Sequence, residues 1–102
     1  MKHKRLLMEN AVPALSWRET ARADLLAIVE YIADDNPDAA QQLKDEIETK
    51  VSELAQFPQM YKSGRVAGTR EMVVRSNFIV VYTEDVETVS VLRVLHAAQQ
   101  WP

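Results

Sequence analysis

The sequence predicts an α+β domain made of an N-terminal strand, an antiparallel helical hairpin and a three-stranded antiparallel meander. Apolar residues recur at helical spacing between residues 21 and 54. After Pro58 the period changes, and three β-branched, apolar segments follow, each separated from the next by a short polar gap. A chain of 102 residues has room for one core. We therefore expect a single domain over residues 12–102, preceded by a flexible leader over residues 1–11.

The first ten residues, "MKHKRLLMEN", are basic and then briefly apolar. Their apolar stretch is shorter than the ~7–15 residues of a secretory signal, so Met8 is an alternative start. No apolar run reaches the ~20 residues that cross a bilayer, and we expect a cytoplasmic protein with no membrane partner. The chain has no cysteine, which excludes disulfides and thiolate metal sites. With two histidines in the whole chain, we expect no metal site.

Residues 12–17, "VPALSW", are typical of a short strand. Pro13 lacks an N–H, so this strand should lie at a sheet edge or begin at Ala14. Ser16 and Glu19 fit the S-x-x-E capping box, which predicts the start of a helix. The helix has an apolar face made of Ala21, Leu25, Ile28 and Ile32, widened by Leu26 and Val29.

The segment "DDNPDAA" ends this helix and begins the next. Asn36 is a good N-cap, Pro37 suits the first helical position, and Asp38 favours the positive end of the helix. The second helix should run to about Phe57, where Pro58 stops it. Its apolar stripe is Ala40, Leu43, Ile47, Val51 and Leu54. The short link predicts an antiparallel helical hairpin.

The three later segments cover residues 68–74, 78–84 and 88–97. Their gaps are the size of hairpin loops, which predicts the antiparallel meander and the order β-α-α-β-β-β. These strands are apolar on both faces in places. That pattern suits a central position, or one face under the helices and the other under a partner.

Charge is distributed unevenly along the chain. The net charge is −3, with −6 between Arg18 and Leu54 and +3 between Lys62 and Tyr82. The overall balance argues against a general nucleic-acid binder. The helical part is acidic and the middle of the sheet is basic. This pattern is either solvated surface charge or the mark of a surface that meets a partner.

This order of elements, with particular motifs, resembles the RelE/ParE superfamily of toxins from bacterial type II toxin–antitoxin modules. The motifs are "W-x-x-x-A-x-x-D-L" from Trp17, "NPDAA", "FPQMYKSGRVAGTREMVV", "NFIVVY" and "VLRVLHAAQQWP". The resemblance implies a helical hairpin packed on a twisted antiparallel sheet, into which the N-terminal strand pairs. It also implies a cognate antitoxin as partner. RelE-like members cut messenger RNA in the ribosomal A site, whereas ParE-like members poison DNA gyrase.

RelE-like nucleases carry lysine and arginine on the middle strands and at the end of the last strand. The matching positions here hold Glu71, Val73, Ile79 and Ala97, none of which stabilises a pentavalent phosphate. The resemblance therefore implies a ParE-like toxin that inhibits DNA gyrase by binding, without a cofactor. Many relatives also carry arginine near the position of Ala98. The alanine here is either natural variation or an engineered change.

Two alternatives stay open. The first is a RelE-like ribosome-dependent mRNA interferase, an endoribonuclease in which His96 acts as base or acid. Its charge would come from Arg65, Arg70, Arg75 and Arg93. The second is a non-toxic relative that only binds an antitoxin. For two of these residues a structural role competes with the catalytic one. His96 would then be hydrogen-bonded to a backbone carbonyl, and Arg70 would be paired with an acidic residue.

The remaining candidates are contact residues. Tyr61 and Tyr82 could stack a nucleobase, although Tyr82 also fits a core aromatic with its hydroxyl at the edge. The tail from His96 to Trp101 begins where strand pairing ends, so we expect it to meet the target or the antitoxin. Trp101 either docks back on the domain or projects into a partner. The contact candidates are Tyr61, Tyr82, Arg93, Gln99, Gln100 and Trp101. The antitoxin should cover an apolar groove or add to a sheet edge.

Overall fold

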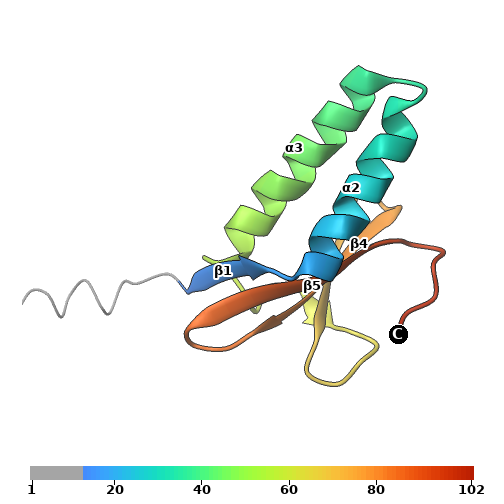
Figure 1. The fold of residues 1–102 in the computed structure, drawn as a ribbon. Coiled ribbons are helices and arrows are strands. Elements are labelled where there is room, and N and C mark those ends of the chain that lie inside the picture. The colour runs from blue at the N-terminus through green and yellow to red at the C-terminus, as the bar shows by residue number, and fades with distance from the viewer. Residues whose placement is uncertain (1–12) are drawn as a thin grey trace, which may run out of the picture.

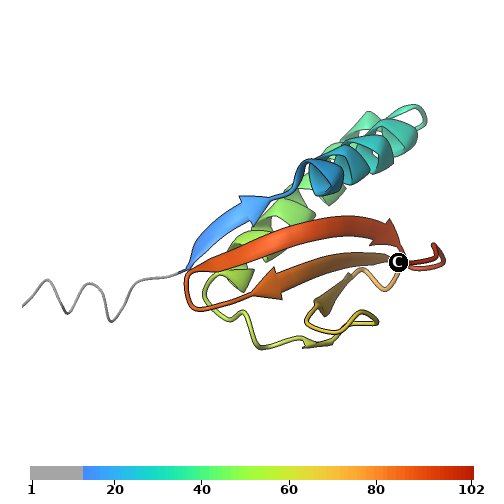
Figure 2. The same cartoon turned by 60° about the horizontal axis from the view of Figure 1, so that its bottom comes forward.

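A computed structural model describes residues 13–102 and shows two helices packed on one face of a single sheet (Figures 1 and 2). The predicted leader over residues 1–11, with the alternative start at Met8, lies outside the described residues. The elements are β1 (Ala14–Trp17), α2 (Glu19–Ala33), α3 (Pro37–Leu54), β2 (Lys62–Ser63), β3 (Arg70–Val74), β4 (Phe78–Glu84) and β5 (Thr88–His96). None of the helices in this part of the chain is long and apolar enough to span a membrane.

The sheet has the strand order β1-β5-β4-β3-β2. Strands β3, β4 and β5 form the predicted antiparallel meander, with Val73 opposite Ile79 and Val80 opposite Val94. The N-terminal strand pairs with β5 in parallel, which makes the sheet mixed. Strand β2 was not predicted, because two residues are too few to show a period; it pairs with the start of β3. The predicted α+β class and order are confirmed, with β2 as the addition.

Strand β1 begins at Ala14 and lies at the sheet edge, as the proline before it requires. The predicted capping box is wrong. Ser16 is a strand residue opposite Ser90, and the N-cap of α2 is Arg18, which makes no side-chain capping bond. Pairing with β5 extends to the backbone N–H of Arg18, which donates to Val91 at 2.9 Å. The strand therefore runs through the positions that a capping box would need.

The helical hairpin is confirmed (Figure 1). The Asn36 side chain accepts a hydrogen bond from the N–H of Ala39 at 3.0 Å, so it caps α3 as predicted. Helix α3 ends at Leu54, earlier than the predicted Phe57. On α2, Leu26 does not widen the buried face, because it is 57% exposed.

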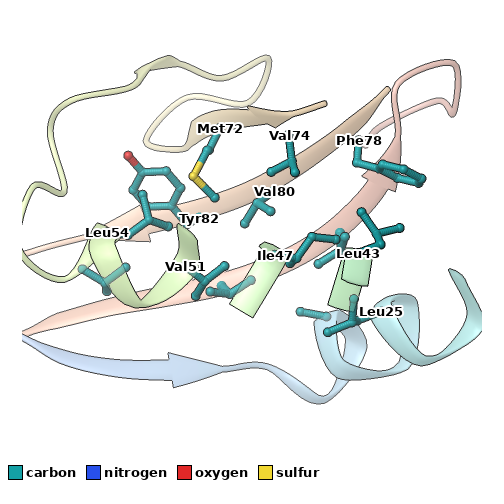
Figure 3. Close-up of a cluster of buried hydrophobic side chains, with 14 residues drawn as sticks. Leu25, Leu43, Ile47, Val51, Leu54, Met72, Val74, Phe78, Val80 and Tyr82 are labelled. Carbon is teal, nitrogen blue, oxygen red and sulfur yellow. The ribbon is translucent and has the colours of Figure 1, made fainter. Parts of the chain in front are cut away.

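Two apolar clusters form on opposite faces of the sheet. The larger lies under the helices, where the stripe of α3 meets Met72, Val74, Val80 and Tyr82 (Figure 3). All five stripe residues of α3 are at most 2% exposed. The smaller cluster contains Ile79, Val81 and Leu95, against which Leu92 and Trp101 pack. Alternate residues of β4 thus enter different clusters, which explains why the strands are apolar on both faces.

Candidate functional site

The C-terminal tail begins at the end of β5 and is tied to the neighbouring strand end. The N–H of Ala97 donates to the carbonyl of Asn77 at 2.8 Å, and the N–H of Gln99 donates to the carbonyl of His96 at 2.9 Å. The Gln99 side chain in turn accepts from the N–H of His96 at 3.2 Å. Gln99 therefore stabilises the turn at the start of the tail, while Gln100 is exposed.

Trp101 docks back on the domain, which decides between the two placements that the sequence left open. Its ring packs on the smaller cluster, and the Arg93 guanidinium lies 5.7 Å from the ring centroid. At this distance an arginine is attracted to the face of an indole. The indole N–H is buried and finds no hydrogen-bond partner within residues 13–102.

Arg93 joins the sheet to the first helix. Its guanidinium donates twice to the Asp24 carboxylate, at 2.7 and 3.1 Å. Asp24 also accepts a hydrogen bond from the backbone N–H of Val94 at 2.9 Å. Val94 lies on the part of β5 that follows its pairing with β1. The hydrogen bonds that its guanidinium donates to Asp24 raise the pKa of Arg93 above its usual range, against the opposing effect of burial. Asp24 thus supplies an acceptor to β5 where its neighbour strand has ended.

His96 is exposed at the end of β5. Its ring contacts Phe78 edge-on, with centroids 5.7 Å apart and planes at 82°. The Nδ1 atom accepts a hydrogen bond from the N–H of Ala98 at 3.2 Å, so the expected bond to a backbone carbonyl is wrong. An accepting Nδ1 places the proton of the neutral ring on Nε2. His96 also borders an apolar concavity of about 410 Å³ with Ile28, Tyr31 and Phe78.

Arg65 is held by a buried carboxylate. Its backbone N–H donates to Glu71 at 2.9 Å, and its Nε lies 3.3 Å from the same oxygen. Glu71 is 5% exposed and is the ion-pair partner of Arg65. Gly64 lies against this carboxylate and against the Thr69 hydroxyl, with no room for a Cβ. The loop before β3 is thus built around Glu71.

Arg70 and Arg75 are also used to join segments. Arg70 donates to the carbonyl of Tyr61 at 2.7 Å and lies 3.5 Å from Glu84, so it pairs with an acid as one interpretation expected. Arg75 is in the β3–β4 turn with a φ of 56° and donates to Glu46 of α3 at 2.7 Å. This pair ties the turn to the helical hairpin.

The nuclease candidates are therefore not brought together. Arg65, Arg70, Arg75 and Arg93 each meet a different carboxylate. Within the described part of the chain, none of their hydrogen bonds or ion pairs involves His96. Residues 13–102 also contain no cluster of three or more histidine or acidic side chains that could hold a metal ion.

The two candidate tyrosines have structural roles. The Tyr82 ring is fully buried, and its hydroxyl donates to the carbonyl of Pro58 at 2.6 Å. Burial raises the pKa of Tyr82 to about 12. The core interpretation of Tyr82 is therefore the one observed, and its ring cannot stack a nucleobase. Tyr61 is half-buried against the larger cluster.

The sequence does not predict two features of the structure. Asp24 belongs to the motif that begins at Trp17, and that motif is the signal that could have marked it. Phe57 and Met60 are both exposed, and composition alone gives no sign of that exposure.

Comparison with known families gives a match over almost the whole chain. Residues 15–101 match the family model described as the ParE toxin of the type II toxin-antitoxin system, parDE.

Two curated relatives are similar over most of their length. The chain is 40% identical over 91 residues to "Putative toxin Y4kP" of Sinorhizobium fredii, covering 86% of this chain and 92% of the relative. It is 35% identical over 85 residues to "Toxin RelE2" of Caulobacter vibrioides, covering 81% of this chain and 93% of the relative.

Solved structures share the fold. The toxin–antitoxin structure titled "Chromosomal ParDE TA system from P. aeruginosa" has a chain that matches with a TM-score of 0.75 and 22% identity, over 83% of this chain and 96% of that one. A chain of the RelBE2 toxin–antitoxin complex from Mycobacterium tuberculosis matches with a TM-score of 0.55 and 24% identity, over 84% and 99%. At these identities the likeness concerns the fold alone.

Proposed function

The chain belongs to the ParE toxin family of type II toxin–antitoxin systems, and we propose that it acts by binding DNA gyrase without breaking a bond itself. As the toxin of a type II module, it has a cognate antitoxin as its partner. The choice of gyrase over the ribosome is our proposal, because relatives with both ParE and RelE names are similar to this chain.

The observation that carries the proposal is that four arginines are each paired with a different carboxylate. Cleavage of RNA by its 2′-hydroxyl needs a base, an acid and cations that converge on one phosphate. Here four guanidinium groups are divided among four carboxylates, which offset their charge and fix their direction. A phosphate would have to displace those carboxylates one by one. The geometry favours a surface that binds a macromolecule over a site that cleaves one.

The test is a supercoiling assay with purified gyrase and relaxed plasmid. We expect the toxin to inhibit supercoiling and to trap cleaved gyrase–DNA complexes, and we expect pre-incubation with the antitoxin to abolish both effects. Gyrase that remains fully active with a large molar excess of folded toxin would refute the proposal.

A second candidate is the ribosome-dependent mRNA interferase. It is favoured by the 35% identity to a relative named "Toxin RelE2" and by the exposure of His96 at a strand end. In this case translating ribosomes with a reporter message would show cuts in the A site, and His96→Ala would abolish them. Intact message at a toxin concentration that arrests growth would remove this candidate.

A further inference from the structure

The link between α3 and β2 presents two large apolar side chains to solvent. Phe57 is 59% exposed and Met60 is 64% exposed. With Pro58 and Gln59 they line an open concavity of about 470 Å³. We call residues 57–60 the apolar loop. Single exposed apolar residues are ordinary, but two large ones around one concavity are typical of a contact surface.

The backbone of the apolar loop is held from both sides. The hydroxyl of the fully buried Tyr82 donates to the carbonyl of Pro58 at 2.6 Å. Arg70 donates to the carbonyl of Tyr61, just after the loop, at 2.7 Å. Within the loop, the N–H of Met60 donates to the carbonyl of Phe57 at 3.2 Å. A loop fixed in this way loses little conformational entropy when a partner covers it.

One exposed lysine follows the apolar loop. From Phe57 to Arg70 the chain carries three cations, of which Arg65 and Arg70 are paired with Glu71 and Glu84. The first of these cations, Lys62, is exposed and follows the loop directly. An apolar surface with an exposed lysine beside it complements an apolar pocket that is bordered by acidic side chains.

We propose that the apolar loop and Lys62 form the surface by which this toxin grips its protein target, an acidic protein surface with a pocket for Phe57 and Met60. The inference rests on the proposed function, in which the toxin acts by binding a protein. It assigns the target, and not the antitoxin, to this part of the molecule.

The first experiment uses the full chain with Phe57→Ser, Met60→Ser and both changes together. Val86→Ser is the matched control, because Val86 is an exposed apolar residue on a different turn and is 91% exposed. Three quantities are measured: growth arrest on induction, inhibition of gyrase supercoiling, and the Kd for the cognate antitoxin. Thermal midpoints of all variants show that each one is folded.

We expect the double variant to lose inhibition of gyrase and of growth by at least about tenfold, as for a truncated anchor in an interface centre. Its antitoxin Kd and thermal midpoint should stay close to those of the unchanged chain. Val86→Ser should leave all readouts unchanged. Equal potency of the double variant and the unchanged chain would overturn the inference, and so would a matching loss of antitoxin affinity.

The second experiment tests the charge. Lys62→Glu should weaken inhibition and Lys62→Arg should preserve it, and their difference should shrink as salt is raised. If the unchanged chain binds a DNA or RNA fragment and Lys62→Glu abolishes that binding, the partner is a nucleic acid and the inference is wrong.

The outcomes also separate this inference from the proposed function. A toxin that arrests growth without inhibiting gyrase removes gyrase as the target, and the surface is then judged by whether the double variant still arrests growth. A chain that does not arrest growth removes both.

Discussion

Tyr82 gives a stability prediction with a defined pH window. Its ring is fully buried, and its hydroxyl donates to the carbonyl of Pro58. Substituting phenylalanine keeps the ring and removes the donor. Because this leaves a part-buried carbonyl without its partner, we expect Tyr82→Phe to lower the free energy of unfolding by about 1–2 kcal/mol at neutral pH.

The pKa of Tyr82 adds the pH dependence. Burial raises it from 10.0 to about 12 in the folded protein, so the unfolded chain releases this proton at lower pH than the folded one. The contribution from Tyr82 is therefore complete below pH 10 and is lost as pH rises from 10 to about 12. One pKa unit corresponds to about 1.4 kcal/mol, so the total loss is on the order of 2–3 kcal/mol.

The assay is urea unfolding of the unchanged chain and of Tyr82→Phe at several pH values from neutral to 12. The stability difference between them isolates Tyr82 from the other groups that titrate in this range. We expect the advantage of the unchanged chain to fall by about 1.4 kcal/mol per pH unit above pH 10. Tyr31→Phe is the control, because Tyr31 is 82% exposed and should show no such change. A pH-independent difference between the unchanged chain and Tyr82→Phe would refute the assignment of the buried hydroxyl.

Three further predictions concern stability, each measured by urea unfolding. Asp24→Ala should lower the free energy of unfolding by about 2–3 kcal/mol, since it leaves a half-buried guanidinium and a strand N–H without their acceptor. The loss should be much smaller when Arg93 is already alanine. Additive losses in the double variant would contradict the ion pair. Gly64→Ala should cost about 1–3 kcal/mol through its clash with the Thr69 hydroxyl, and Thr69→Ala should relieve part of that loss. Asn36→Ala should cost about 1 kcal/mol and Asn36→Asp a few tenths, whereas equal losses would exclude capping by the side-chain oxygen.

The sequence predicted what depends on local periodicity. The helical spacing from Ala40 to Leu54 identified a stripe that is buried along its whole length, since a single face of a helix repeats every three to four residues. The two gaps between the later strands predicted the meander for a similar reason, as a short loop leaves two strands no choice except antiparallel pairing. The Asn36 cap followed from three adjacent residues.

Local pattern failed where distant parts of the chain compete for the same residues. Ser16 fits a capping box, but pairing with Ser90 holds it in a strand. Arg93 and Asp24 are 69 residues apart, and no spacing rule connects them. The same holds for Arg75 and Glu46, 29 residues apart. The carboxylate partners of the arginines could therefore only be seen once the fold was known.

Strand β3 shows how the fold turns residues that could serve catalysis into structural ones. Arg70 and Glu71 are neighbours in sequence, so their side chains leave β3 in opposite directions. Arg70 fixes the carbonyl of Tyr61 before β2, while Glu71 fixes the backbone and guanidinium of Arg65 after it. A cation and an acid that a nuclease would use on a phosphate thus hold both flanks of β2 in place. The apolar loop, which ends one residue before Tyr61, is kept in its exposed position by the same arrangement. The contacts that hold Arg70 and Glu71 in structural roles therefore also fix the backbone next to the apolar loop.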